Sequence, residues 1–250
     1  MNINDKMQCK KIYRGQMNFF HKNRIYAEEN FDVYKDTKVM DMAFISTLHS
    51  RTTTGELMQI KTYYEINKNW TPNKVIVEKK MGEKFSIESY AFNSQTSSIH
   101  YSFSNSSIST EHVMNTNPKF HITTPTAASS MLFIQTKKFD ATSSNECVVV
   151  VSENQWFYEK PPKTSNLYLE KLSLTSEPLT LNKSVVQNVR YRIYNTHLLG
   201  SADPRKKDEI GEDVLEPVFV YLSQHVSIPY ILENEDNKIM IKFLRDLDND

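Results

Sequence analysis

Hydrophobic and polar residues alternate with a period of two along most of the chain, and this pattern predicts β-strands. The alternation is clearest in the middle, where Ile99, Tyr101 and Phe103 share one face of a predicted strand. His100 and three serines occupy the opposite face. A period of two with one polar face is typical of a half-buried antiparallel sheet.

The predicted strands, this one included, are short and rich in aromatic and β-branched residues, with turn residues between them. They cover Arg24–Tyr34, Val39–Arg51, Lys61–Ile66, Asn73–Met81, Lys84–Asn93, Ser97–Ser104, Ser107–Met114, Glu146–Val151, Val185–Asn195, Val214–Ser223, Ile228–Asn234 and Lys238–Leu244. Most connections are too short for a crossover helix, so neighbouring strands are expected to pair antiparallel. The last two strands are expected to form a hairpin around Glu235–Asn237.

Two helices are expected beside these strands. Thr124 can cap a helix that begins at Pro125, and Ala127 and Met131 follow at helical spacing. A weaker helix candidate covers Asp5–Phe20. The pattern therefore predicts a mainly β protein, in which a single curved antiparallel sheet forms a partly closed barrel around one or two helices.

We find no composition shift or low-complexity linker that would divide the chain, so residues 1–250 are expected to form a single β-barrel-like domain. Residues 1–20 are expected to be an N-terminal extension, possibly helical in part, and residues 245–250 a flexible tail. The segment Leu199–Asp213 is expected to be a charged surface loop.

Composition excludes several classes of function. Thirty basic residues balance thirty acidic ones, and such a neutral surface argues against nucleic acid as a partner. Only five glycines occur and none are close together, which excludes the dinucleotide fingerprint, the phosphate loop and the glycine-flanked serine of hydrolases. We see no metal-binding spacing of Cys or His, so we expect no metal and no cofactor.

Two further features concern the compartment. No stretch is long and apolar enough to cross a membrane, so no integral membrane contact is expected. The first residues contain no apolar signal core, so a cytoplasmic protein is expected, with Cys9 and Cys147 as reduced thiols.

The order of features in the C-terminal third carries a resemblance to known proteins. A turn and an alternating strand (Leu179–Ile193) are followed by the charged break at Lys206–Asp213, then by Val218–Glu233 and Lys238–Leu244. This order resembles a family of bacterial proteins of unknown function that is similar in fold to the lipoprotein carriers LolA and LolB. The segment Glu28–Tyr34 and the stretch Tyr63–Met81 likewise look like the opening strands of lipocalin-like bacterial proteins.

The resemblance implies a half-open β-barrel over a helix and a hydrophobic ligand class, but no activity. This chain departs from the family in having Asn182-Lys183-Ser184 where relatives usually place a glycine. Many relatives carry a signal peptide, whereas the first residues of this sequence contain no apolar signal core, so none is expected.

The candidate ligand-binding residues are those predicted to face the interior. In the Lys84–Asn93 strand, alternation puts Phe85 on the apolar face and Glu88 on the opposite one. The predicted lining consists of Phe85, Tyr101, Phe103, His112, Tyr191 and Ile193. The same aromatic residues could instead fill an ordinary β core.

Candidate catalytic residues come from a predicted register. If Asn105-Ser106 is a two-residue turn, His100 faces Glu111, and a carboxylate opposite a histidine can orient a general base. The alternative is a solvated cross-strand pair on the outer face. In the same register His112 faces Ile99 on the apolar side, where it could hold a ligand or be an ordinary core histidine.

Two more candidates lie outside that hairpin. His121 lies just before the predicted helix, where a neutral imidazole is favoured, or in a loop. Arg190 and Arg192 share one strand face, and if that face pointed inward they could hold a carboxylate or phosphate. The alternative is an outward polar face, with Tyr191 and Ile193 lining the interior.

Three functions therefore stay open at the level of sequence. The first is binding of a hydrophobic small molecule or lipid-like ligand in the barrel cavity. The second is a cofactor-independent enzyme, such as an isomerase, cyclase or lyase, that uses the same cavity. The third is a protein-interaction module that uses an exposed sheet edge. A buried polar cluster around His112, His121, Arg190 or Tyr191 would favour the enzyme, and a uniformly apolar cavity would favour the carrier.

Overall fold

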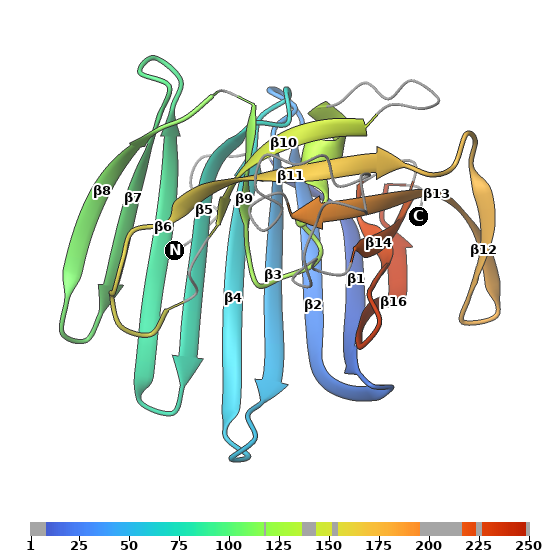
Figure 1. Cartoon of the computed structure of the whole chain (residues 1–250), viewed down its shortest axis with the longest axis horizontal. Coiled ribbons are helices and arrows are strands. Elements are labelled where there is room, and N and C mark those ends of the chain that lie inside the picture. The colour runs from blue at the N-terminus through green and yellow to red at the C-terminus, as the bar shows by residue number, and fades with distance from the viewer. Residues whose placement is uncertain are drawn as a thin grey trace, which may run out of the picture.

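The computed structural model describes residues 9–117, 119–136, 144–151, 155–195, 217–223 and 227–248. Within these ranges sixteen strands belong to one sheet, which does not close on itself (Figure 1). The first eight strands are β1 (Cys9–His21), β2 (Arg24–Asp36), β3 (Met42–Arg51), β4 (Leu57–Ile66), β5 (Pro72–Met81), β6 (Lys84–Asn93), β7 (Ser98–Asn105) and β8 (Ser109–Asn115). The others are β9 (Phe120–Thr123), β10 (Ser144–Val151), β11 (Lys163–Lys171), β12 (Glu177–Leu181), β13 (Ser184–Asn195), β14 (Val218–Ser223), β15 (Pro229–Glu233) and β16 (Asn237–Asp246).

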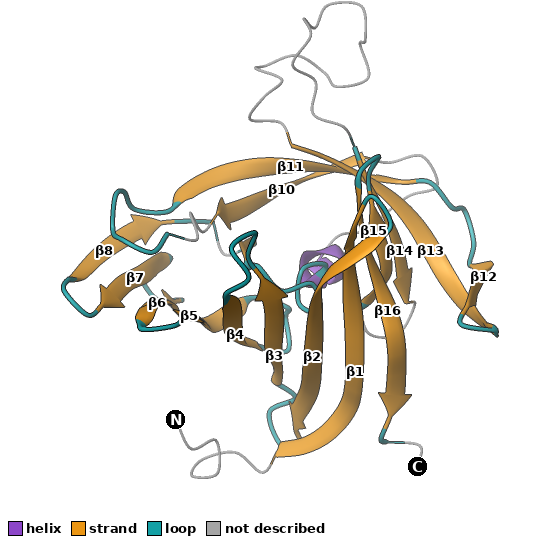
Figure 2. Cartoon of the chain, turned by 90° about the horizontal axis from the view of Figure 1, so that it is seen from below, coloured by secondary structure: helices purple, strands orange, loops and turns teal. Residues whose placement is uncertain are grey.

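The sheet begins as a meander and then turns back over itself. Strands β8 to β1 lie side by side in sequence order, and the sheet continues from β1 through β16, β15, β14, β13, β11 and β10 to β9. The pairing is antiparallel except between β9 and β10. Strands β10, β11 and β13 cross over the first strands at a steep angle, and β9 comes to lie against β5 (Figures 1 and 2). A long twisted sheet curls in this way because a flat one would expose both faces.

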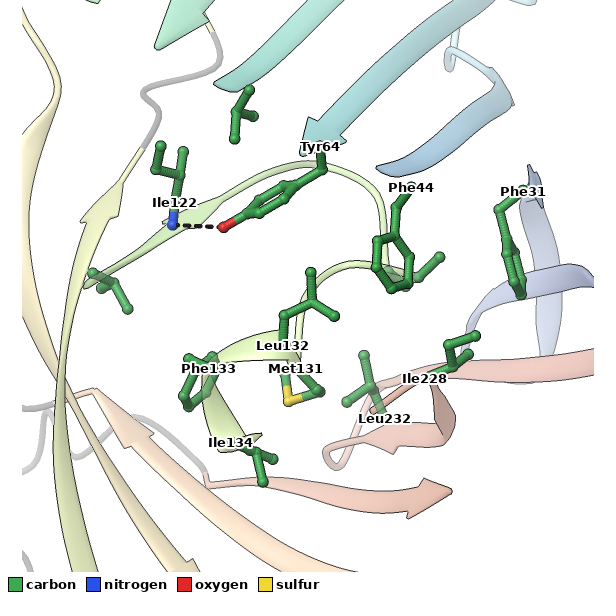
Figure 3. Packing of buried hydrophobic residues seen from close by; sticks show 14 of the residues in the cluster. Phe31, Phe44, Tyr64, Ile122, Met131, Leu132, Phe133, Ile134, Ile228 and Leu232 are labelled. Carbon is green, nitrogen blue, oxygen red and sulfur yellow. Dashed lines mark hydrogen bonds between the residues drawn. The ribbon is translucent and has the colours of Figure 1, made fainter. Parts of the chain in front are cut away.

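The core fills much of the space inside the curled sheet. A stretch that we call the internal segment (Thr124–Thr136) runs through this space and ends in the 3₁₀ helix η2 (Leu132–Thr136). Its side chains pack between Phe44 and Tyr64 on one side and Ile228 and Leu232 on the other (Figure 3). One half of the barrel interior is therefore packed with apolar side chains.

A buried carboxylate fixes the internal segment to the sheet. Glu29 of β2 is fully buried, and its carboxylate accepts the backbone N–H groups of Ala127 at 2.6 Å and Ala128 at 3.2 Å. Burial raises the pKa of this carboxyl, and the two N–H bonds oppose the rise because they favour the charged form. A buried turn needs partners for its free N–H groups, and Glu29 supplies them from a strand about one hundred residues earlier in the chain.

The predicted helix at Thr124 is wrong. Residues 124–131 form turns, and the only helix among the described residues is the five-residue η2. An amphipathic α-helix buries one face, whereas Ala127, Ala128 and the run Met131–Ile134 are all buried. Most of the segment is buried, so its course follows the packing rather than helix propensity. Residues 137 and 138 of the expected helix lie outside the described residues.

The expected N-terminal helix is also wrong over its described part, because residues from Cys9 to His21 form β1. The buried residues Gly15, Met17 and Phe19 alternate with a period of two, and β1 pairs with both β2 and β16. Gly15 is required by this packing, since a Cβ there would lie 2.3 Å from the Phe31 ring and 2.9 Å from a backbone oxygen. The described residues Cys9–His21 are thus a central strand of the sheet.

The C-terminal strands agree better with the prediction. The hairpin around Glu235–Asn237 is confirmed as β15–β16. Residues 245 and 246, expected in a flexible tail, belong to β16, and the N–H of Leu247 donates to the Ile12 carbonyl at 2.8 Å. Asn182 and Lys183 both have positive φ and form the tight β12–β13 turn without a glycine. The charged segment Leu199–Asp213 lies outside the described residues.

Candidate functional site

Strands β5 to β8 place an unexpected row of side chains on the inner face of the sheet. Register pairs Lys79 with Ser86, Val77 with Glu88, and Tyr90 with Tyr101. Because directly opposed residues of paired strands point to the same side, these residues share one face. Lys79 is 5% exposed and Glu88 is 4% exposed, so this half of the interior contains buried charges.

Lys79 and Glu88 interact within this row. The Tyr90 hydroxyl donates to the Glu88 carboxylate at 2.7 Å, and the Lys79 ammonium lies 4.2 Å from the centre of the Trp156 ring. Burial lowers the pKa of Lys79 to about 8, and the negative charge of Glu88 limits the fall. A lysine with this pKa exchanges its proton near neutral pH. We call Lys79, Glu88, Tyr90 and Trp156 the polar cluster.

A short segment between β10 and β11, Gln155–Tyr158, covers the cluster, and we call it the strap. It contains no strand, and hydrogen bonds attach it to the sheet. Ser86 donates to the Gln155 carbonyl at 3.2 Å, and Asn105 donates to the Trp156 carbonyl at 3.1 Å. The strap is therefore held by single side-chain bonds at these positions, not by a ladder of backbone bonds.

His112 of β8 contacts the far end of the strap. Its Nε2 is hydrogen-bonded to the Tyr158 hydroxyl, and the two rings stack with centroids 5.7 Å apart. Tyr158 also packs against Phe103, with 5.8 Å between centroids. The inward orientation predicted for Tyr101, Phe103 and His112 is confirmed, because Tyr101 and Phe103 are fully buried and His112 lies opposite Tyr101. Their role in binding stays a prediction.

The predicted pairing of His100 with Glu111 is wrong. The β7–β8 turn spans Asn105–Ile108, closed by the Asn105 N–H to the Ile108 carbonyl, so His100 pairs with Val113 and Glu111 with Ser102. The turn holds two more residues than expected, which moves the register by two but keeps each side chain on its predicted face. His100 and Glu111 line an outer hollow of about 310 Å³ with Ser89, Ala91, Tyr101, Ser102, His112 and Val113.

The face predicted for β6 is also wrong. Phe85 is 40% exposed on the outside, while Ser86 and Glu88 are buried. Phe85 instead lines a hollow of about 570 Å³ near the β5–β6 turn, whose lining includes residues of both faces. Its other lining residues are Gln59, Lys61, Glu78, Lys79, Lys80, Gly82, Glu83, Ser86 and Ile87. At the start of this strand Phe85 lies outside and Ser86 and Glu88 lie inside, so hydrophobicity alone assigns the wrong face.

His121 lies deep in the core, in β9 rather than before a helix. Its Nδ1 is 2.9 Å from the Tyr64 hydroxyl, which also accepts the Ile122 N–H at 3.1 Å (Figure 3). The direction of the hydrogen bond between the hydroxyl and Nδ1 depends on the tautomer of the imidazole. Burial lowers the pKa of His121 to about 3, so the imidazole is neutral and acts as a core hydrogen-bond partner.

Arg190 and Arg192 face outward, which is the alternative in which the other face of their strand lines the interior. Arg190 pairs with Glu177 at 2.8 Å and Arg192 with Glu170 at 2.6 Å. All four side chains are partly exposed, so these pairs contribute little stability. Tyr191 and Ile193 are buried on the other face of β13, as predicted for lining residues. These positions contradict the hypothesis that two inward guanidinium groups hold an anion.

The sequence pattern did not predict the polar cluster, because only the apolar residues of a strand were taken to mark its inner face. Val75, Val77 and Lys79 continue one face of β5, and that spacing could have placed Lys79 inside. Within the described ranges no three His, Cys, Asp or Glu side chains form a metal site. The same part of the chain contains no helix of the length and apolarity needed to span a membrane.

Comparison with solved structures decides the fold. A DUF1089 family protein from Pseudomonas aeruginosa superposes with a TM-score of 0.50 at 9% identity, over 84% of this chain and 90% of that one. A β-barrel-like protein of the domain of unknown function DUF1849 from Brucella abortus superposes with a TM-score of 0.57 at 7% identity, over 94% of this chain and 98% of that one. The fold is β-barrel-like. No protein-family model and no curated protein sequence matches the chain.

Proposed function

We propose that the protein binds an amphipathic small molecule inside the barrel, with the polar end of the molecule at Lys79 and Glu88 beneath the strap. This proposal keeps the lipid-like ligand expected from sequence and adds a polar anchor. It also retains the likeness to the LolA and LolB carriers, whose half-open barrels hold hydrophobic cargo. The cytoplasmic location and the absence of nucleic-acid partners stay predictions from composition.

The observation that carries the proposal is the burial of a lysine and a glutamate in a barrel interior that is otherwise largely apolar. Removing an ammonium and a carboxylate from water costs several kcal/mol per ion, and replacing such a pair by apolar residues is often neutral or stabilising. Glu88 and Lys79 are both at most 5% exposed. Ionisable groups with displaced pKa values in such places are candidates for binding or catalysis.

The attachment of the strap offers a route to the cluster. Its contacts with the sheet include the bonds from Ser86 and Asn105 and the stacking of Tyr158 on His112. Each such neutral hydrogen bond contributes about 1 kcal/mol. Opening the strap requires breaking these contacts but none of the backbone pairings of β5 to β8. A ligand could therefore enter without unfolding the sheet.

The second candidate, a cofactor-independent enzyme, is favoured by one specific observation. Lys79 has a pKa of about 8 and faces Trp156, and a general base functions best when its pKa is near the operating pH. Lys79 would take or return a proton on a ligand bound beneath the strap. If incubation with the protein converts a bound compound into a product of different mass or, for an isomer, of different chromatographic retention, the enzyme is favoured over the carrier.

The experiment is mass spectrometry of compounds extracted from gently purified full-length protein. We expect the wild type to release an amphipathic compound that the double variant Lys79→Met/Glu88→Gln does not retain. The matched control is Glu78→Gln/Lys80→Met, which removes the same two charges from exposed neighbours on the same strand. Equal retention by the cluster variant, or no compound from any of the folded proteins, would refute the proposal.

A further inference from the structure

The turns that follow β1, β3, β5 and β7 all lie at one edge of the barrel. Strands β1 to β8 are consecutive and antiparallel, so every second turn falls on the same side of the sheet (Figure 1, lower edge). We call this edge the hairpin edge; it comprises residues 22–26, 51–58, 80–85 and 105–108. The turns after β2, β4 and β6 form the opposite edge.

Exposed large apolar residues gather at the hairpin edge. They are Ile25 (53% exposed), Tyr26 (47%), Leu57 (56%), Phe85 (40%) and Ile108 (44%). The three turns of the opposite edge contribute Val39 and Met40 to the same class. Single exposed apolar residues are ordinary, whereas a concentration at one edge marks an interaction surface.

Basic side chains accompany these apolar tips. The exposed basic residues of the hairpin edge are Lys22, Arg24, Arg51, Lys80 and Lys84, and its exposed acidic residues are Glu56 and Glu83. The adjoining β15–β16 turn adds Glu235 and Asp236, and Asp236 lies 3.9 Å from the Lys22 ammonium. The four hairpin tips therefore carry an excess of positive charge in a chain with no net charge.

We propose that the hairpin edge docks onto an anionic lipid bilayer. The apolar tips would enter the interface between headgroups and acyl chains, and the arginines and lysines would contact lipid phosphates. A fluid bilayer suits this edge because the apolar residues sit on four separate turns. A protein partner would need one continuous complementary surface, on the order of 800 Å² on each side. Docking leaves every strand pairing intact and requires no membrane-spanning element.

The test is co-sedimentation of the full-length protein with vesicles. We expect binding to phosphatidylcholine vesicles that contain phosphatidylglycerol, little binding to phosphatidylcholine alone, and weaker binding as salt rises. The variant Ile25→Ser/Leu57→Ser should lose at least about tenfold in affinity, because two apolar side chains would no longer enter the bilayer interface. The matched control Val39→Ser/Met40→Ser, at the opposite edge, should bind as the wild type does.

A second variant keeps the proposal testable if the first variant does not fold. Arg24→Gln/Arg51→Gln changes only exposed charged side chains, and it should weaken binding to anionic vesicles while circular dichroism stays unchanged. Four results would overturn the proposal: no vesicle binding, equal loss in the opposite-edge control, no salt dependence, or self-association abolished by the tip variant, which would indicate a second copy as the partner. The variant Lys79→Met/Glu88→Gln should still bind anionic vesicles, because it leaves the five apolar tip residues unchanged. This result distinguishes failure of the ligand site from failure of membrane docking.

Discussion

The two halves of the barrel interior are built from similar strands but contain different chemistry. Around the internal segment, β2 to β4 face β15 and the loop before it through Phe44, Leu132 and Ile228. On the β5 to β7 side the inner face contains Lys79 and Glu88 beneath a strap held by side-chain hydrogen bonds. The first half is filled and stabilises the fold. It has one buried carboxylate, Glu29, which accepts two backbone N–H groups of the internal segment, whereas the second half has both a buried lysine and a buried glutamate beneath the strap.

The largest predicted effect concerns the apolar half. Phe44→Ala should destabilise the protein by about 3–5 kcal/mol, because the ring is 1% exposed and its removal leaves a cavity among packed side chains. Chemical denaturation followed by circular dichroism measures this change. Phe85→Ala is the matched control on the outer face, and its effect should be much smaller. Equal losses in the two variants would contradict the assignment of inner and outer faces.

A second prediction concerns His121, at the border of the apolar half. The folded-state pKa of His121, about 3, lies below the ordinary value of 6.5. Between these two values the unfolded chain binds a proton that the folded protein does not bind. The contribution of the neutral ring to stability is therefore complete above pH 6.5 and is lost as the pH falls toward 3. The wild type should lose about 3 kcal/mol between pH 7 and pH 4 relative to His121→Gln. Denaturation at several pH values measures this, and the exposed His100→Gln should show no such difference.

A third, smaller effect sharpens the comparison on the polar side. Because the pKa of Lys79 falls to about 8 on folding, its buried ammonium costs stability below pH 8, and the cost disappears as the pH rises toward 10.5. The stability of the wild type relative to Lys79→Met should therefore rise by up to about 3 kcal/mol over that range, less where water reaches the amine. Lys80→Met, on the exposed face, should show no comparable trend. A flat difference for Lys79→Met would contradict its burial.

The sequence predicts the architecture better than the site. Alternation such as Ile99–Tyr101–Phe103 fixes which faces of the meander are buried, because a period of two has a single physical explanation in a half-exposed sheet. It fails where the interior is polar, as at Glu88, since apolar residues then no longer mark the inner face. The internal segment could not be predicted because Glu29, far away in sequence, determines its course.

The register of the β7–β8 hairpin shows a similar limit. The register depends on whether the turn at Asn105 contains two residues or four. The Asn105 side chain stabilises the longer turn by accepting the N–H groups of Ser107 and Ile108 at 2.9 Å. This local choice separates His100 from Glu111 and brings Tyr101 opposite His112. Prediction of a site from paired strands therefore requires the turn type as well as the alternation.

The most direct measurement of ligand binding beneath the strap is energy transfer from Trp156 to an amphipathic probe, dansylated undecanoic acid. In a Trp70→Phe background Trp156 is the single tryptophan, and it lies 4.2 Å from the Lys79 ammonium. We predict saturable energy transfer that disappears in Lys79→Met/Glu88→Gln and persists in Glu78→Gln/Lys80→Met. Transfer that never saturates, or that is equal in the two double variants, would contradict binding at the polar cluster.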